Sequence, residues 1–363
     1  MVLVCVERRS SFMKKRTLFA IVIAILFMII GGVGTFFTQK QLINEREENA
    51  INKKIPTKEN KTLNIHFSSS TLVTITKSDD DNIYMNKQGV DFKLDKTTQA
   101  DCTFTEEKDI SSLTINNPTV NHDSRYPFSI INFNSYTDDT VYLRIPQHYE
   151  AIHINGENIN LSMYDFSIDN MEFNISTGSI SLQDVRANHI SQTKSDTDFM
   201  IQDSKVLDTL NVNSKQYDIN VLNTTAKQMT LSTGMGNIFT GNTKGELNIS
   251  SEDGDVSINH TTGKSTITTK HGDILFHDDA IDFDTTLSST NGDITIETDT
   301  SSIDHNHIDF ETSLGDISIF NKNLSSERKY KTNKGKISIK ATTKNGEIDV
   351  EELDSEDTHY GYD

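Results

Sequence analysis

The chain has 363 residues, 34% hydrophobic residues, no tryptophan and a formal net charge of −19. This acidic balance excludes the extended basic surface that binding to nucleic acid phosphates requires. Its two cysteines, Cys5 and Cys102, provide neither a disulfide framework nor a cysteine spacing typical of zinc sites.

The first sixty residues predict a membrane anchor. Residues 18–37 carry no charge, and twenty such residues are long enough to span a bilayer as a helix. Five cations precede them, namely Arg8, Arg9, Lys14, Lys15 and Arg16. We therefore predict a cytoplasmic N-terminus at residues 1–16, a transmembrane helix at 17–38, and an extracellular remainder that begins with a polar linker or stalk at 39–60. A cleaved signal peptide is the alternative, but no small-x-small cleavage site comes after the apolar run. Met13 is a second candidate for the natural start.

Residues 61–150 are rich in alternating polar and apolar residues, as in Leu63–Phe67 and Val141–Ile145, with Pro146 closing the second run. This alternation is typical of β-strands. The strands do not share the spacing of the repeat in residues 151–350. We predict an irregular β cap over residues 61–150 that covers the first coil of that repeat, because repeat arrays need atypical ends to protect their edges.

The repeat fills residues 151–350. Its units begin at turns spaced 18 to 23 residues apart, except for a last spacing of 11, and apolar residues recur two and four positions after each turn. Asn291-Gly292 shows the turn most clearly, because Asn-Gly adopts positive backbone dihedrals at low cost. The predicted turn glycines are Gly178, Gly236, Gly254, Gly272, Gly292, Gly315, Gly335 and Gly346.

One unit of two short strands cannot bury its apolar face, whereas stacked units align identical residues about 4.8 Å apart in continuous ladders. The fold class predicted is therefore all-β, a parallel β-solenoid with one coil per unit. An antiparallel meander of Asn-Gly hairpins is the rival. Glu297–His307 is predicted to bulge out as a loop, the short last spacing to end in a half-turn or hairpin at Gly346, and residues 351–363 to form a solvated acidic tail.

The iterated Ser/Thr-x-x-Gly-Asp-Ile-x-Ile units from Gly178 to Val350, with the upstream strand ending Leu143-Arg144-Ile145-Pro146, resemble the DUF4097 family of bacterial β-strand-repeat proteins. Members are often labelled adhesins, so the resemblance implies an adhesion role. A single anchor before such a domain is also similar to the accessory membrane proteins of Lia-type envelope-stress operons in Gram-positive bacteria. The family carries over no catalytic or binding residues. The chain lacks a Leu-Pro-x-Thr-Gly sorting motif, which speaks against covalent attachment to the wall.

Two groups of residues are candidates for metal binding. The first is the column Asp255, Asp273, Asp293 and Asp316, whose carboxylates would repel one another at about 5 Å unless a cation such as calcium lay between them. The alternative is that each Asp accepts a hydrogen bond from a turn amide and faces water. The second group is His271, His277, Asp278, Asp279, His305 and His307, which has zinc-ligand chemistry without a known spacing. The alternative there is scattered surface histidines.

The residues contain no recurring carboxylate pair beside a base, no Ser-His-Asp order and no phosphate-binding glycine loop. We therefore predict a non-enzymatic protein with no cofactor and no catalytic residues. Its partners would be the membrane, through the anchor, and an envelope protein or glycan, in a binding or sensing role. A surface adhesin is the first alternative, although ten coils reach only about 50 Å, and a polysaccharide-active enzyme is the second.

Overall fold

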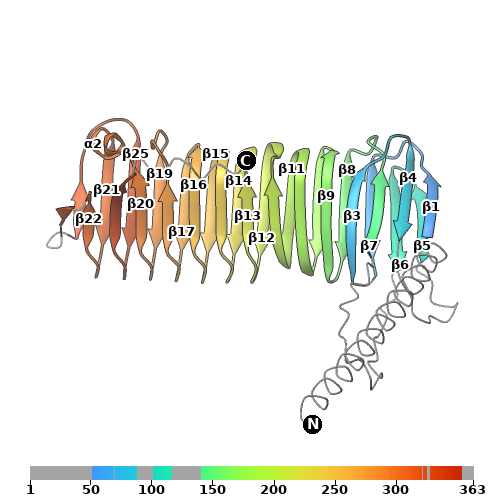
Figure 1. Ribbon diagram of the computed structural model, residues 1–363, viewed down its shortest axis with the longest axis horizontal. Coiled ribbons are helices and arrows are strands. Elements are labelled where there is room, and N and C mark those ends of the chain that lie inside the picture. Colours follow the sequence, from blue (N-terminus) through green and yellow to red (C-terminus); the bar gives the residue numbers. More distant parts are fainter. Residues whose placement is uncertain are drawn as a thin grey trace, which may run out of the picture.

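The computed structural model describes residues 51–68, 70–87, 101–116, 140–320, 322–324 and 328–353. Figure 1 shows an elongated stack of strands that stand side by side along the long axis. The strands at its N-terminal end are β1 (Ile51–Pro56), β2 (Thr62–Phe67), β3 (Thr71–Lys77), β4 (Asn82–Lys87), β5 (Asp101–Glu107), β6 (Ile110–Asn116) and β7 (Thr140–Ile145).

The middle and the C-terminal end of the stack complete the set of elements. The middle strands are β8 (Ala151–Gly156), β9 (Ile159–Ser167), β10 (Asn170–Ile175), β11 (Thr177–Gln202), β12 (Lys205–Ser214), β13 (Ile219–Leu222), β14 (Thr225–Thr233), β15 (Ile238–Ser251), β16 (Val256–Thr262), β17 (Ser265–Thr269), β18 (Ile274–His277), β19 (Thr285–Ser289) and β20 (Ile294–Thr298). The last elements are α2 (Thr300–Asp304), β21 (His307–Thr312), β22 (Ile317–Ile319), β23 (Lys322–Asn323), β24 (Lys329–Lys331), β25 (Ser338–Thr343) and β26 (Ile348–Glu352).

Parallel pairing between equivalent strands of successive units builds two ladders. The first runs β6–β2–β8–β10–β11–β12–β14–β15–β17–β19–β25–β21, and the second runs β7–β3–β9–β11–β13–β15–β16–β18–β20–β26–β22. The long strands β11 and β15 contribute to both. The all-β prediction is confirmed, and hairpin pairing is not what joins these units.

The core lies between the ladders and consists of stacked identical positions. One column in the second ladder is Ile219, Ile238, Val256, Ile274, Ile294, Ile348 and Ile317, joined partner to partner by the register and each at most 1% exposed. Burying each of these side chains contributes roughly 1.5–3 kcal/mol. The strand period of two puts every second residue into this core, which is why the apolar columns were visible in the sequence.

The last coil does not sit at the end of the stack. β25 pairs with β19 on one side and with β21 on the other, and β26 lies in the same way between β20 and β22. The chain therefore leaves a gap after Thr298, builds the terminal coil from residues 307–319, and returns to fill the gap with residues 338–352. The predicted half-turn or hairpin at Gly346 is wrong, because Gly346 stacks between Gly292 and Gly315.

Gly335 also departs from its predicted place in the turn column. A Cβ on Gly335 would lie 2.0 Å from the carbonyl oxygen of His305, so Gly335 does not stack on another turn glycine. The φ of Gly335 is +64°. Gly335 belongs to the return segment that leads from the terminal coil to the last coil. In this segment β24 pairs antiparallel with β21 and so covers the outer edge of the terminal coil. The predicted loop Glu297–His307 contains the one-turn helix α2, whose first turn is capped by Asp299.

The N-terminal end repeats this arrangement. β2 pairs with β6 and β8, and β3 pairs with β7 and β9, so the first coil lies second from the end. The predicted irregular cap is thus partly a regular coil. β5 pairs antiparallel with β6, and β4 lies antiparallel between β1 and β7. Antiparallel strands thus flank both ends of the stack, where open edges would invite pairing with other chains.

Two further sequence predictions meet the described residues only in part. Ile51–Pro56 forms β1, so the end of the predicted linker at 39–60 belongs to the folded stack. Among the residues that the structure describes, no helix is long and apolar enough to cross a membrane. The predicted anchor at 17–38 and most of the predicted tail at 351–363 lie outside those residues.

Candidate functional site

A pocket of about 560 Å³ lies at the N-terminal end of the stack, where β1, β4, β7 and β3 are neighbours. Its lining residues are Lys53, Lys54, Thr74, Thr76, Tyr84, Met85, Asn86, Tyr142, Leu143 and Arg144. The lining includes three cations and no acidic residue. The pocket is therefore a basic site in a chain whose net charge is −19.

The register of β1, β4 and β7 places a cation, a ring and a second cation in one row. Lys54 is the register partner of Tyr84, and Tyr84 is that of Arg144. Register partners on adjacent strands project from the same face of a sheet. The Arg144 Cζ lies 4.4 Å from the centroid of the Tyr84 ring, and the Lys54 Nζ lies 5.5 Å from it. Both distances are within the range of cation–π attraction.

Asp80 fixes the ring at the centre of this row. The Tyr84 hydroxyl donates a hydrogen bond to Asp80 Oδ2 at 2.7 Å, and the Asn82 N–H donates to Asp80 Oδ1 at 3.0 Å. These bonds, first the one from Tyr84, lower the pKa of Asp80 to about 2. Asp80 also lies 3.7 Å from the Lys54 Nζ. Lys54 is therefore partly neutralised, whereas Arg144 carries the charge best placed to meet an anion.

Arginine with lysine beside an aromatic ring suits a phosphate or carboxylate group. The guanidinium presents a planar fork of N–H donors that matches such anions with two parallel bonds. The hydroxyls of Thr74 and Thr76 in the lining add neutral donors. The pocket can therefore hold an anionic group against a polar, aromatic wall.

The predicted turn glycines show why the repeat needs this residue. A Cβ on Gly236, Gly254, Gly272, Gly292, Gly315 or Gly346 would lie 1.9 to 2.1 Å from a backbone carbonyl oxygen of the neighbouring coil. The expected positive φ at Gly292 is wrong: among the described glycines, only Gly178, Gly245, Gly263 and Gly335 have a positive φ. Close stacking of the turns, and not a left-handed backbone, excludes a side chain at Gly292.

The Asp column also receives a structural role. Asp255 Oδ1 accepts the N–H of Asp273 at 2.9 Å, Asp273 Oδ1 accepts the N–H of Asp293 at 2.8 Å, and Asp293 Oδ1 accepts the N–H of Glu347 at 2.8 Å. Each carboxylate thus bonds the amide of the next coil at the same turn position. Asp293 therefore has a structural role that the sequence alone did not show, which is to bond the amide of the neighbouring coil. Asp316, the fourth calcium candidate, lies in the terminal coil, where its carbonyl accepts the Ile348 N–H at 3.0 Å.

Two overlapping segments of the chain match a model of a known family. The DUF4097 model, described as Toastrack DUF4097, matches residues 60–246 and 193–351, which together exceed half of the chain. The chain belongs to the Toastrack DUF4097 family. A search of curated proteins finds no match.

Solved structures similar to this Toastrack chain have low sequence identity. A candidate cell adhesion protein from Clostridium sporogenes is 10% identical, with 84% of this chain and 100% of that one covered and a TM-score of 0.21. A candidate adhesin from Bacteroides fragilis is 13% identical, with 83% and 96% covered and a TM-score of 0.34. A candidate lipid-binding protein from Parabacteroides distasonis is 14% identical, with 83% and 96% covered and a TM-score of 0.38.

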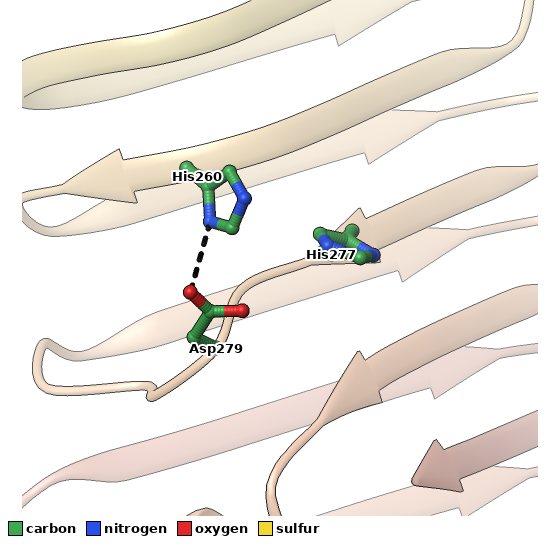
Figure 2. Close-up of side chains that lie close together, drawn as sticks. All are labelled: His260, His277 and Asp279. Carbon is green, nitrogen blue, oxygen red and sulfur yellow. Dashed lines mark ion pairs between the residues drawn. The ribbon is translucent and has the colours of Figure 1, made fainter. Parts of the chain in front are cut away.

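The predicted histidine group of this Toastrack protein is divided by the fold. His277 and Asp279 lie at one corner, together with His260, which the sequence reasoning missed (Figure 2). Asp278 lies at the same corner, with its Oδ1 3.9 Å from the His260 Nδ1. His271 lies elsewhere, with its Nδ1 2.5 Å from Asp253 Oδ1. The remaining two members are His305, at the C-cap of α2, and His307, the first residue of β21.

The pocket residues of this Toastrack protein were missed for a topological reason. Lys53 and Lys54 were placed in the linker, and Arg144 was seen only as part of the strand before Pro146. Alternation in Val141–Ile145 does predict that Tyr142 and Arg144 share the outer face. No local pattern shows that β1 and β7 flank β4, since these two strands lie far apart in the sequence.

Proposed function

We propose that this Toastrack protein is a membrane-anchored, extracytoplasmic binding protein of the bacterial cell envelope, without enzymatic activity, whose basic pocket holds a phosphate-bearing envelope polymer. The observation that carries the proposal is the row Lys54–Tyr84–Arg144 along the pocket wall. A polymer with repeated phosphates fits better than a neutral glycan, because the lining concentrates cations in an otherwise acidic chain.

The proposal includes a parallel β-solenoid as the scaffold. Parallel pairing at intervals of 18 to 20 residues from β9 to β20 supports a chain that winds once per unit. Such a scaffold would hold the pocket at one end on strands and not on loops. Sites on rigid elements keep their geometry more precisely than sites on loops.

The anchor is part of the proposal because of where the pocket lies. Residues 18–37 are uncharged and precede β1, which supplies Lys53 and Lys54. The twelve residues from 39 to 50 span at most about 40 Å when fully extended. With a membrane anchor at 17–38, the start of β1, the strand that supplies Lys53 and Lys54, would lie within that distance of the outer membrane surface. The ligand of the pocket would therefore be a component of the membrane–wall interface.

Binding titrations of the purified full-length chain test this function. The probe is poly(glycerol phosphate), and neutral dextran is its uncharged comparison. We expect binding to the phosphate polymer that weakens as salt is raised, since salt screens exposed charges. Arg144→Gln should weaken it by about 10- to 100-fold, because a hydrogen bond to a charged group contributes about 1.5–3 kcal/mol.

The matched control is Arg186→Gln, which removes an exposed arginine from β11, three strands from β7 and outside the pocket lining. It should bind as the unaltered chain does. Equal binding by the Arg144 and Arg186 variants, or equal binding of dextran and the phosphate polymer, would refute the pocket as the binding site.

The narrower roles of stress signalling and adhesion need separate tests. A role in envelope stress rests on the resemblance to Lia-type operons, and it requires genes for a histidine kinase and a response regulator beside this one. An adhesin must reach beyond the wall. Surface labelling of intact cells would support adhesion, whereas labelling only after removal of the wall would support the envelope role.

A further inference from the structure

One corner of the stack gathers nitrogen and oxygen ligands from two adjacent coils. His260 belongs to β16, His277 is the last residue of the neighbouring strand β18, and Asp279 comes two positions later. The register pairs Asn259 with His277, so the next residue, His260, lies directly beside this strand end. Figure 2 shows the two rings and the carboxylate facing a common space.

The distances suit a single small cation. One ligand atom from each of His260, His277 and Asp279 can be chosen so that all lie within 4.8 Å of one another. The His260 Nδ1 lies 3.9 Å from Asp279 Oδ2, and the two imidazole rings meet edge to face with centroids 5.1 Å apart. Zinc binds imidazole nitrogen and carboxylate oxygen at about 2.0–2.2 Å, which sets ligand atoms roughly 3.4 Å apart. Small side-chain rotations close the difference.

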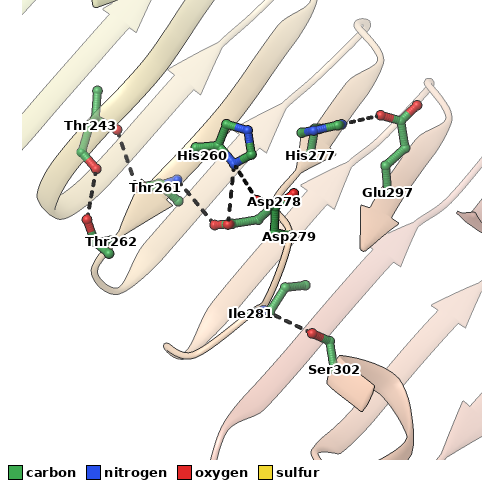
Figure 3. A network of polar contacts seen from close by, with 10 residues as sticks. All are labelled: Thr243, His260, Thr261, Thr262, His277, Asp278, Asp279, Ile281, Glu297 and Ser302. Atoms are coloured by element: carbon green, nitrogen blue, oxygen red, sulfur yellow. Dashed lines mark hydrogen bonds and ion pairs between the residues drawn. The ribbon is translucent and has the colours of Figure 1, made fainter. Parts of the chain in front are cut away.

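Other groups already constrain His277 and the segment that carries Asp279. The His277 Nδ1 lies 2.7 Å from Glu297 Oε2, which leaves Nε2 as the ring nitrogen available to an ion (Figure 3). Metal-bound histidines usually donate their second N–H to a carboxylate in this way. Asp278 Oδ2 accepts the Thr261 N–H at 3.2 Å, which fixes the segment from which Asp279 projects.

His260 breaks a regular column at this corner. The equivalent left-handed position is taken by Asp184, Asp203, Asn223 and Asn242 in the preceding coils. There, the Asn223 and Asn242 amides donate to the residue one coil earlier at 2.9 and 3.1 Å. His260 keeps the left-handed backbone, with a φ of +53°, although Asp and Asn are the residues that favour it. The side chain of this column therefore changes from Asp or Asn to an imidazole at the coil whose neighbour carries His277.

An unsatisfied oxygen lies in the same place. The side-chain Oδ1 of Asn259, the register partner of His277, is buried and has no hydrogen-bond partner among the described residues. Buried polar atoms are nearly always satisfied by protein or by ordered water. A water molecule bound to an ion at the corner would supply such a partner.

We propose that His260, His277 and Asp279 bind one zinc ion, with Glu297 as the carboxylate that orients His277. Two imidazoles and one carboxylate suit zinc, whereas calcium requires a larger set of oxygen ligands. Three protein ligands leave a fourth position for water. The ion ties the segment after β18 to β16, and thereby joins two coils by a contact that the repeat itself does not contain.

Zinc titration of the chelator-treated full-length chain, monitored by calorimetry and native mass spectrometry, tests the site. The expected result is one zinc ion per chain and no competition from calcium. His260→Asn keeps the residue type of the preceding coils and so keeps the turn, and His277→Gln keeps a donor for Glu297. Each should weaken zinc binding by at least about tenfold, the lower end of the effect of losing an orienting carboxylate.

The control is His189→Asn, because His189 also contacts a hydroxyl and lies near an Asp, with its Nδ1 2.9 Å from Thr209 Oγ1 and 3.7 Å from Asp208 Oδ2. This variant should bind zinc as the unaltered chain does. Zinc should also raise the melting temperature of the unaltered chain and of the control, but not that of His260→Asn. Absence of zinc binding by the unaltered chain, or equal binding by the His260, His277 and His189 variants, would overturn the proposal.

Discussion

Replacing Gly292 by alanine tests how closely the turns of the stack approach one another. An added Cβ would lie 2.1 Å from the Gly272 carbonyl oxygen and 2.9 Å from Asp273 Oδ1. Ordinary contact starts near 3.4 Å, so the two coils must separate by more than 1 Å at this turn. Two hydrogen bonds cross the same gap, from the Ile274 N–H to the Asp293 carbonyl at 2.9 Å and from the Asp293 N–H to Asp273 Oδ1 at 2.8 Å.

These contacts set the cost of the substitution. Each lost hydrogen bond removes about 0.5–1.5 kcal/mol, and overpacking adds about 1–3 kcal/mol. Gly292→Ala should therefore lower the free energy of unfolding by about 2–6 kcal/mol. Gly241→Ala is the control, since the nearest atom to its Cβ is the tip of the Leu222 side chain at 2.9 Å, which can rotate away. That change should alter stability by less than about 1 kcal/mol.

Denaturant melts monitored by circular dichroism measure both variants, and amide hydrogen exchange at Ile274 and Ile294 shows whether the loss is local. Gly292→Asn separates the two explanations of the glycine. Asparagine tolerates a left-handed backbone, so it would rescue a turn that needed positive φ. It cannot relieve a collision with the next coil. Stability near that of the unaltered chain in Gly292→Asn would refute close stacking as the cause.

Three further predictions concern the carboxylates and the order of the coils. Burial raises the pKa of the Asp278 carboxyl above 3.8. The folded chain therefore holds this proton more tightly than the unfolded chain, and stability falls as pH rises from about 3.8 through the raised pKa of the folded state. With chelator present, Asp278→Asn should raise the melting temperature at pH 7 and raise it less near pH 4; a lower melting temperature at both pH values would contradict this. Asp273→Ala should cost about 1 kcal/mol in denaturant melts, whereas Asp273→Asn keeps the acceptor and should cost nothing; equal losses would count against the ladder of side-chain bonds. Cysteines that replace Thr286 and Lys340, which are register partners on adjacent strands, should form a disulfide on oxidation. Cysteines that replace Thr286 and Asp309 should not, because these residues lie two strands apart, at about 9.6 Å. The reverse pattern on gels would mean that the last coil lies at the end of the stack.

The apolar columns and the all-β class could be predicted because they depend on local periodicity, whereas the family was indicated by the resemblance of the iterated Gly-Asp-Ile units. Val256, Ile274 and Ile294 recur at the same position after each turn, and the fold stacks them in one ladder. The sequence also predicts the turn glycine at position 292, but the predicted reason, a positive φ, is wrong. Backbone preference can be read within one unit, whereas the close approach of Gly272 exists only between units.

The order of the coils could not be predicted from the same evidence. Residues 307–319 and 338–352 carry similar apolar patterns, so the sequence allows either segment to supply the strands beside β19 and β20. Exchange of equivalent coils leaves the local pattern unchanged, and only the long return segment between them decides which lies outside. The same limit hid the candidate sites. Arg144 meets Tyr84 across β7 and β4, and His260 meets His277 across β16 and β18.

Binding of poly(glycerol phosphate) to the full-length chain tests the central claim most directly, namely that the basic pocket at the N-terminal end of the stack holds a phosphate-bearing ligand. The claim predicts salt-sensitive binding that Arg144→Gln weakens by about 10- to 100-fold while Arg186→Gln leaves it unchanged. Binding that both variants retain in full, or an unaltered chain that does not bind the polymer at low salt, would contradict it.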